Sequence, residues 1–383
     1  MRIFLTLHPS ANLSVPGSMT WYHNLYEPLL DLGQDVVLLR MDEVAKNHNV
    51  KFRSKKFKEL FSKELISIFR KEHTIKPFDL FFSYITDLEV EDGVIQSIKS
   101  MGVPMANFSC NNTHQFFLIE KISPFFDYNL HSEKDADIKL RAIGANPVWF
   151  PMAANPKYYF PYEGAFKYDV SFIGAAYAKR VFYVNQLVQN NISIDCFGPN
   201  WLINKPYTKL KKIKKEAERI KWLMEALFSL SISKRSNLSS GIYQYDLLVN
   251  LRKSNAGRFH YPVSDKEMVS IFNRSKINLG FLEVYSDRSQ QTVQQHLHLR
   301  EFEVPMSRGL YLTNYSDELA EFYEPGKEVI MFHNEHELLD KVKFFLQNPI
   351  DAEKIRHAGY LRAKECHTYQ KRLTDLLRKL NLK

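Results

Sequence analysis

Short apolar runs alternate with helical stretches along the first third of the chain. Residues 3–7, 80–84 and 103–108 have the length and composition of buried strands. Between these runs, residues 19–32 and 52–70 are predicted to be helices, the second with a basic face. Strands separated by helical spans indicate parallel βαβ units in a doubly wound sheet.

A proline-rich stretch interrupts this alternation. Four prolines with aromatic residues between them predict an extended connector from Pro147 to Lys167. After this connector the alternation begins afresh. Strands are then expected at residues 168–174, 192–197, 277–281, 310–313 and 328–332. No strand is expected after residue 350, where residues 351–380 are predicted to be helical.

The pattern therefore predicts an α/β protein with two Rossmann-like, doubly wound domains that face each other across a cleft. We expect the first domain at residues 1–155 and the second at residues 156–350. Residues 351–383 are expected to form helices that can pack back towards the first domain. A chain of 383 residues is longer than one ordinary domain, and its 45% hydrophobic residues suffice for two cores.

The charge of the chain predicts an anionic partner. The net charge is +9 and the isoelectric point is near 9.1. The segment from Lys209 to Lys221 carries seven basic and two acidic residues, and its apolar positions recur at helical spacing. A solvated helix face, an anionic membrane surface and a polyanionic substrate each explain this segment, and the sequence leaves the choice open.

Cysteine content and hydropathy favour a cytoplasmic protein. Cys110, Cys196 and Cys366 are few and widely spaced, so neither a disulfide framework nor a zinc site is expected. No apolar run reaches the roughly 18 residues that a membrane helix needs. The first apolar run is too short for a signal peptide, so none is expected. A peripheral position at the inner face of a membrane is the alternative that the basic segment suggests.

Candidate chemistry is expected where strands end, because ligands of tandem doubly wound sheets bind at the carboxyl ends of the strands. The turn from Gly174 to Lys179 and Arg180 combines a glycine, free backbone N–H groups and two cations, which suit a diphosphate. It is neither a dinucleotide-binding nor a P-loop motif. A tight turn with a solvated Lys-Arg pair is the alternative.

Further candidates lie in the first domain. Asn111, Asn112 and His114 follow the predicted strand at 103–108, and a histidine there can orient a sugar hydroxyl or stabilise a developing charge. A helix-capping cluster explains these residues equally well. Tyr22 and His23 follow the long loop after the first strand, which would face a second substrate, although an ordinary buried pair also explains them.

The third group precedes and begins the helix predicted at 300–307. The loop from Glu283 to His298 is rich in glutamine and histidine, including Gln295, which suggests recognition of hydroxyls and bases and not metal ligation. In the helix, the Glu303 carboxylate suits a ribose diol and the Arg300 guanidinium suits a phosphate. An ordinary surface ion pair at i and i+3 is the alternative.

Six short motifs in one order resemble a known family. They are the run from Asp169 to Gly174 followed by Arg180, Phe197-Gly198 with Trp201, Arg300 and Phe302-Glu303 with Gly309, the run from Glu324 to Val329, Glu337-Leu338, and His367-Thr368-Tyr369 with Arg372. Together they resemble the spore-maturation CgeB-like branch of the GT-B glycosyltransferases. The resemblance covers residues 169–372, and the first domain is similar only in general form.

The resemblance implies a nucleotide-sugar donor in the second domain and an acceptor in the first. It implies that Glu303 binds the donor ribose and that Lys179, Arg180 and Arg300 lie near the diphosphate. His114 falls where related enzymes place a cleft histidine near the reacting sugar. It also implies no bound metal or other cofactor, since cations and helix N-termini stabilise the leaving nucleoside diphosphate.

One departure from the family pattern concerns the stereochemistry. Many retaining relatives carry a second glutamate where this chain has Gln295. Retention is therefore favoured only weakly, and no nucleophile or base is assigned. We expect transfer of a sugar to a hydroxyl of a glycan, glycolipid or protein. There are two alternatives. One is a glycosyltransferase acting on nucleic acid, which is disfavoured because the sequence carries no known nucleic-acid-binding motif. The other is a non-catalytic protein that binds a sugar nucleotide or a glycan.

Overall fold

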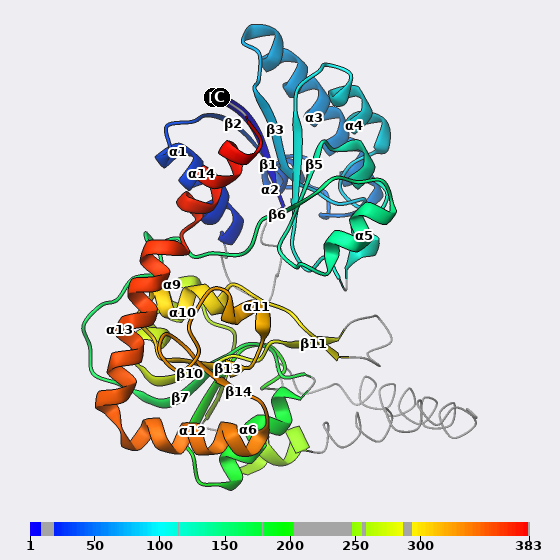
Figure 1. The fold of residues 1–383 in the computed structure, drawn as a ribbon. Coiled ribbons are helices and arrows are strands. Elements are labelled where there is room, and N and C mark those ends of the chain that lie inside the picture. Colours follow the sequence, from blue (N-terminus) through cyan, green and yellow to red (C-terminus); the bar gives the residue numbers. More distant parts are fainter. Residues whose placement is uncertain are drawn as a thin grey trace, which may run out of the picture.

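The computed structural model describes residues 1–8, 19–113, 115–177, 179–202, 247–254, 258–285 and 293–381. These residues form two lobes, each built on a six-stranded parallel sheet covered by helices (Figure 1). The predicted α/β class with two doubly wound sheets is confirmed. The segment from Lys209 to Lys221 lies outside the described residues.

The first sheet has the strand order β2-β1-β3-β4-β5-β6. Its strands are β1 (Arg2–Leu7), β2 (Asp35–Arg40), β3 (Leu80–Tyr84), β4 (Met105–Ser109), β5 (Tyr128–His131) and β6 (Pro147–Trp149). β1, β3 and β4 are buried along their whole length, which explains their continuous apolar runs.

Helices cover the first sheet, and α3 (Lys55–Ile75) is the longest of those described. It begins where the Ser54 hydroxyl accepts a hydrogen bond from Phe57 N, and it buries Phe57, Phe61, Leu65 and Phe69 at helical spacing. The others are η1 (Tyr22–Tyr26), α1 (Glu27–Asp31), α2 (Met41–Asn47), α4 (Asp92–Lys99), η2 (Phe116–Leu118), η3 (Ser123–Phe125) and α5 (Ala136–Ala142).

The second sheet has the order β14-β13-β10-β7-β8-β9. Its strands are β7 (Tyr168–Ile173), β8 (Ile194–Phe197), β9 (Phe259–His260), β10 (Ser275–Leu279), β13 (Tyr311–Asn314) and β14 (Ile330–Phe332). Its helices include α6 (Arg180–Gln189), α9 (Asp265–Asn273), α10 (Arg300–Met306), α11 (Asp317–Ala320) and α12 (Glu335–Gln347).

A short hairpin replaces the loop predicted from Glu283 to His298. β11 (Glu283–Tyr285) pairs antiparallel with β12 (Val293–Gln295), and Glu283 lies opposite Gln295. The prediction of a loop was wrong because each strand has only three residues. Such short strands, one of them rich in glutamine, carry too little alternation to be recognised in the sequence.

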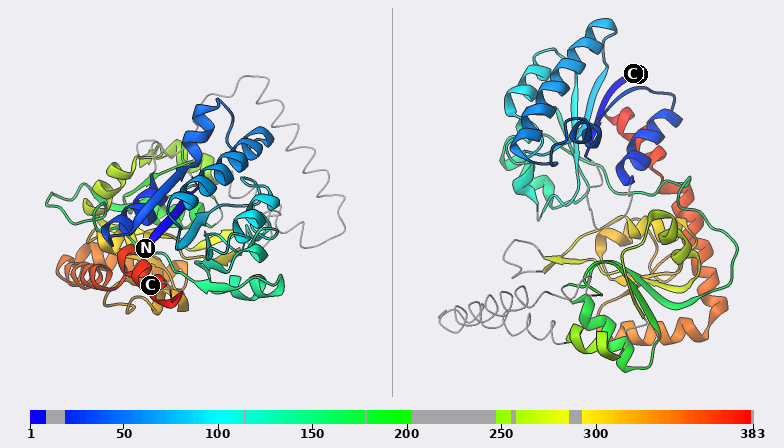
Figure 2. Two further views of the ribbon diagram at one scale, coloured as in Figure 1. Left: turned by 90° about the horizontal axis from the view of Figure 1, so that it is seen from above. Right: turned by 180° about the vertical axis from the view of Figure 1, so that it is seen from behind.

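The chain crosses between the lobes twice, and the two crossings are hydrogen-bonded to each other. The first crossing follows β6, and the second lies between α13 (Pro349–Cys366) and α14 (Tyr369–Lys379). Ala154 N donates to His367 O at 3.0 Å, and Tyr369 N donates to Ala154 O at 3.3 Å. α14 consequently lies beside α1 in the first lobe, as two views show (Figures 1 and 2).

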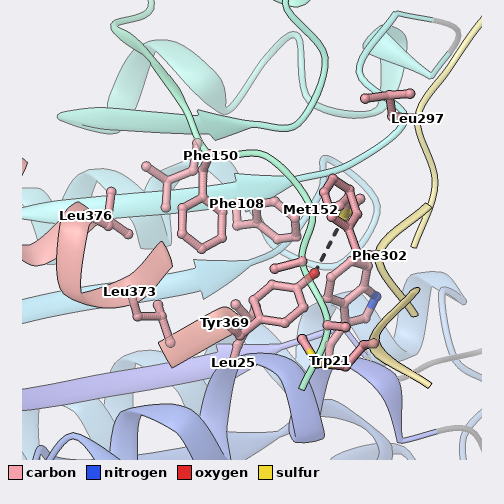
Figure 3. Close-up of a cluster of buried hydrophobic side chains, with 14 of the residues drawn as sticks. Trp21, Leu25, Phe108, Phe150, Met152, Leu297, Phe302, Tyr369, Leu373 and Leu376 are labelled. Carbon is pink, nitrogen blue, oxygen red and sulfur yellow. Dashed lines mark hydrogen bonds between the residues drawn. The ribbon is translucent and has the colours of Figure 1, made fainter. Parts of the chain in front are cut away.

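One apolar core joins the two lobes. Trp21 and Met152 of the first lobe and its connector pack in the same cluster as Phe302 of α10 and Tyr369 of α14 (Figure 3). The Tyr369 hydroxyl donates to Met152 Sδ at 3.6 Å across this core. A continuous core opposes independent movement of the lobes, because separating them exposes apolar surface to water.

Candidate functional site

A cleft with two neighbouring cavities opens between the lobes. The cavities measure about 510 and 340 Å³ and share wall residues from both lobes, including Trp21, Asn111, Gly174 and Arg300. Volumes of this size accommodate ordinary small-molecule ligands. Leu299 and Arg300 come from the start of α10, so this helix faces the first lobe across the cleft.

The cleft lies at the carboxyl ends of the strands in both sheets. β1 is flanked by β2 and β3, and β7 is flanked by β8 and β10, so each sheet reverses its winding beside its first strand. Such a reversal leaves a crevice between the diverging connections. His8 follows β1 and Gly174 follows β7, and both line the cleft.

Glycines that end three strands form its floor in the second lobe. A Cβ at Gly280 would overlap the Tyr311 hydroxyl, and one at Gly174 would come within 2.6 Å of the Phe172 ring. Gly198 has φ +147°, and a Cβ there would overlap the Gly174 carbonyl. Side chains are thus excluded where a ligand could approach the backbone closely.

Arg180 is a buried cation on the wall of the second cavity. It is 6% exposed, and its Nη2 donates to Phe281 O at 3.2 Å. Its guanidinium lies 4.1 Å from the centre of the Tyr177 ring. Burial lowers the pKa of Arg180, and no carboxylate of the described residues forms an ion pair with it. A buried guanidinium of this kind suits an anionic ligand.

Arg300 lines both cavities and pairs with the Glu303 carboxylate behind it. Glu303 is 1% exposed and also adjoins Tyr159. Burial raises the pKa of Glu303, although the charge of Arg300 opposes this shift. The guanidinium is therefore the group that reaches the cleft, and the carboxylate holds it. The ribose-binding role of Glu303 stays a prediction.

The extended chain before α10 directs two histidines into the second cavity. The rings of His296 and His298 lie edge to face with their centres 4.4 Å apart, and both residues line this cavity. Gln295 points the other way, since successive side chains of a strand alternate. It is exposed and donates from Nε2 to Tyr315 O at 2.6 Å, so it does not reach the described walls of the cleft.

Asn111 and Asn112 lie on the first-lobe wall of the cleft, after β4. Asn111 lines both cavities with a left-handed backbone (φ 59°), and Asn112 is buried with its Nδ2 donating to Ser109 Oγ at 2.6 Å. His114, the predicted catalytic histidine, lies outside the described residues. The cleft thus combines Asn111, Asn112, Gly174, Arg180, His298 and Arg300.

Besides Gln295, two further predicted site residues lie away from the described cleft walls. Lys179 forms an ion pair with Glu283 across 3.0 Å. His23 is paired with Glu27 at 3.0 Å, and its ring lies against that of Tyr158, with the centres 3.8 Å apart and the planes tilted by 36°. Neither side chain lines the two cavities as the described residues outline them.

Residues 180–378, about half of the chain, match the model of a family described as glycosyl transferase-like. The chain belongs to this family. The predicted enzyme class, glycosyltransferase, is thereby confirmed, while membership of the CgeB-like branch stays a prediction. No curated protein matches the sequence.

Solved structures share the fold of this glycosyltransferase. Sucrose-phosphate synthase from Thermosynechococcus elongatus is 11% identical, with a TM-score of 0.60 and 99% of both chains covered. HepE from Anabaena, in complex with UDP and glucose, is 9% identical with the same TM-score and coverage. AviGT4, a glycosyltransferase of avilamycin A biosynthesis, is 13% identical, with a TM-score of 0.56 over 99% of this chain and 96% of its own. These likenesses establish the GT-B fold.

Sequence reasoning missed several residues on the walls of this glycosyltransferase's cleft. Glu301 of α10 lines the second cavity, where its carboxylate accepts hydrogen bonds from the Tyr311 hydroxyl at 2.6 Å and from His298 N. Burial raises the pKa of Glu301. A glutamate beside Arg300 carries no motif of its own, and its partner comes from β13, so only the fold could identify it.

A second missed group comes from three separate segments of the first lobe. His8 and Arg53 line the larger cavity, and both approach the fully buried Glu89. The positions are far apart in the sequence, and no periodic pattern links them. Within the described ranges, no three His, Cys, Asp or Glu side chains gather as they would around a metal ion, and the expectation of a metal-free site stays a prediction.

Proposed function

We propose that this glycosyltransferase moves a sugar from a nucleotide-sugar donor to a hydroxyl group of a glycan, a glycolipid or a protein. The observation that best supports the proposal is the pair Arg180 and Arg300 on the wall of the interdomain cleft. Two guanidinium groups beside a glycine-lined floor suit a diphosphate, because each can donate two parallel hydrogen bonds to phosphate oxygens.

The donor would lie against the second lobe. HepE, which shares this fold, has been solved with UDP and with UDP-glucose, which supports a nucleoside diphosphate as the group to be held. In this arrangement Gly174 and Gly280 allow the diphosphate to approach the backbone, and His298 faces the sugar. Glu303 would contribute through Arg300 or bind the ribose directly once the ligand displaces that guanidinium.

The reaction breaks the bond between the anomeric carbon and the diphosphate oxygen, and a bond from the acceptor oxygen to that carbon replaces it. The acceptor hydroxyl gives up its proton to solvent water, and the nucleoside diphosphate leaves as an anion. We propose that Arg180 and Arg300 stabilise this anion in place of a metal ion. We also propose retention of the anomeric configuration, which the family resemblance favours over inversion.

A panel of nucleotide sugars tests the proposal, with thermal unfolding and release of nucleoside diphosphate as the readouts. One donor should raise the midpoint of unfolding, because a ligand that binds only the folded state stabilises it. Arg180→Gln should abolish the increase. Arg356→Gln is the matched control, since Arg356 is also 6% exposed but lies outside the described walls of the cleft.

Each outcome separates the alternatives. A higher midpoint of unfolding with no release of nucleoside diphosphate would favour a non-catalytic binding protein. Binding to duplex DNA that weakens steeply with salt would favour the nucleic-acid alternative. Absence of a shift with every donor, in protein shown to be folded, would contradict the proposal.

The acceptor is proposed to be reached at a membrane surface. None of the described helices is long and apolar enough to cross a lipid bilayer. The basic segment from Lys209 to Lys221 would attract the protein to anionic lipid. Co-sedimentation with liposomes that required neither acidic lipid nor these lysines would contradict this part of the proposal.

A further inference from the structure

Arg53 stands on the first-lobe wall of the cleft in a strained backbone conformation. It lies just before α3 and lines the larger cavity together with His8 and Thr86. Its φ is +62°, in the left-handed region. This conformation is unfavourable for an ordinary residue, whereas glycine or asparagine adopts it readily. Asn49, in the same connection, adopts a similar φ of 48°.

A buried carboxylate fixes the orientation of the Arg53 guanidinium. Glu89 has no exposed surface, and it accepts hydrogen bonds from Thr86 N at 2.6 Å and from the Thr86 hydroxyl. Arg53 Nε donates to Glu89 Oε1. Burial alone would raise the pKa of Glu89, but its interactions with His8, Arg53 and Thr86 outweigh this and lower it to about 2. Glu89 is therefore an anion held in one place.

The two terminal nitrogens of Arg53 remain available to a ligand. Glu89 engages Nε, and within the described residues neither Nη1 nor Nη2 has a hydrogen-bond acceptor. The side chain keeps 32% of its surface exposed and borders the cavity. A guanidinium held through Nε presents the other edge as a fork of two donors.

We infer that Arg53 binds an anionic group with two oxygens, a carboxylate or a phosphate, on the acceptor. The inference rests on the proposed function and deepens it. The fork matches the spacing of two oxygens on one carbon or phosphorus atom, which a neutral hydroxyl cannot offer. Arg53 lies on the wall opposite Arg180 and Arg300, so the acceptor and the donor diphosphate would have separate cationic groups.

Charge neutralisation of Glu89 is the competing explanation for Arg53. It requires a positive charge near the carboxylate but no fork facing the cavity, and His8 Nε2 already lies 3.5 Å from the same oxygen. Substitution by lysine separates the two explanations, because lysine keeps the charge and loses the fork. Under neutralisation alone, Arg53→Lys would bind acceptor as the wild-type protein does.

Binding of matched probes tests the inference. The full chain is first saturated with the nucleoside diphosphate found in the donor panel, so that Arg180 and Arg300 are occupied. Titration calorimetry then compares methyl glucuronide with methyl glucoside, and glucose 6-phosphate with glucose. We expect one charged probe to bind at least about ten-fold more tightly than its neutral partner, as for a charge-assisted pair.

The variants locate the effect. Arg53→Gln should remove the preference for the charged probe while nucleoside diphosphate binding is unchanged. Arg53→Lys should weaken this preference, more for the carboxylate than for the phosphate. Arg40→Gln is the control, because Arg40 is 30% exposed and bonded to Asp42 but lies outside the described cleft walls. Unfolding curves of each variant establish that it is folded.

A preference for the glucuronide identifies a carboxylate acceptor, and a preference for glucose 6-phosphate identifies a phosphorylated one. Equal binding of charged and neutral probes by the wild-type protein overturns the inference, as does a preference that survives Arg53→Gln. Loss of nucleoside diphosphate binding in Arg53→Gln also overturns it, because Arg53 would then belong to the donor site. Failure of every nucleotide to bind the wild-type protein contradicts the proposed function instead.

Discussion

Individual residues at the cleft combine burial with restricted geometry. Arg180 and Arg300 bring positive charge to a wall that three strand-ending glycines leave open. Gly280 has the shortest of these approaches, since a Cβ there would overlap the Tyr311 hydroxyl, which bonds to Glu301. A substitution at the floor should therefore disturb both packing and the polar wall.

Gly280→Ala should lower the free energy of unfolding by about 1–3 kcal/mol, the usual cost of overpacking, and weaken binding of the donor. Gly93→Ala is the control, because a Cβ at Gly93 meets nothing within 4 Å and its helical position favours alanine. Urea unfolding measures the difference. Equal stability of Gly280→Ala and the wild-type protein would contradict the close packing described.

His367 predicts a pH dependence of stability. It is buried, and burial lowers its pKa to about 4, with the charges of Arg372 and Arg362 acting in the same direction. In the unfolded chain the His367 imidazole has its ordinary pKa near 6.5, so it takes up a proton at a higher pH than it does in the folded protein. The part of the stability that depends on neutral His367 should be fully present above pH 6.5 and be lost progressively down to about pH 4.

The variant His367→Gln should show a smaller loss of stability between these pH values, because glutamine does not titrate. Urea unfolding at pH 7 and at pH 4.5 provides the comparison. The same pH difference in the variant and in the wild-type protein would show that other groups cause it.

At the scale of elements, α10 shows how one helix supplies much of the second-lobe wall. Its first turn carries Arg300 and Glu301, and its end is a Schellman motif in which Arg308 N donates to Pro305 O and Gly309 N donates to Val304 O. The left-handed residue of this motif is Arg308 (φ 57°). Gly309 is needed for a different reason, since a Cβ there would lie 2.7 Å from Asn278 Nδ2.

The two positions should therefore respond in opposite ways. Arg308→Gly should leave stability unchanged or raise it by about 0.5–1 kcal/mol, because glycine adopts the left-handed conformation without strain. Gly309→Ala should lower it by about 1–3 kcal/mol through overpacking. Chemical denaturation of both variants tests this. The reverse order would contradict the assignment of Arg308, and not Gly309, as the left-handed residue that ends α10.

The sequence predicted the main elements because their apolar runs are long and complete. Strands such as β1 and β3 are buried throughout, so their sequences are distinctive. The β11–β12 hairpin was missed because it is short and polar. Arg180 and Arg300 could be chosen as candidates because a glycine turn and a helix start mark them in the chain.

Other site residues depend on contacts between distant segments, which one sequence does not reveal. His8, Arg53 and Glu89 meet only when β1, the start of α3 and the segment after β3 are brought together. Gln295 and His298 were grouped as one polar loop, and only the strand geometry separates the side that faces the cleft from the side that does not.

The whole molecule depends on a core that both lobes share. Tyr369 of α14 packs with Trp21 of the first lobe and Phe302 of the second, so the C-terminal helix joins the two sheets (Figure 3). The two crossings are also hydrogen-bonded through Ala154 and His367. This arrangement fixes the two walls of the cleft relative to each other and leaves the cleft itself open.

Unfolding should therefore be cooperative across the lobes. Tyr369→Ala removes a large buried side chain and should lower the free energy of unfolding by about 3–5 kcal/mol, as for other aromatic truncations in cores. Calorimetry should show one transition for the wild-type protein and two for the variant. Lys371→Ala is the control on the same helix, at an exposed position. Two separate transitions in the wild-type protein would show that the shared core does not couple the lobes.

The central claim is that Arg180 and Arg300 form a diphosphate site in the interdomain cleft. Titration calorimetry with a nucleoside diphosphate and with the nucleoside alone tests it most directly, in the wild-type protein and in Arg180→Gln. We predict that the wild-type protein binds the nucleoside diphosphate about ten-fold or more tightly than the nucleoside alone. Most of this difference should disappear in Arg180→Gln. An equal increase in both proteins, or no binding of any nucleoside diphosphate to the folded wild-type chain, would contradict the account.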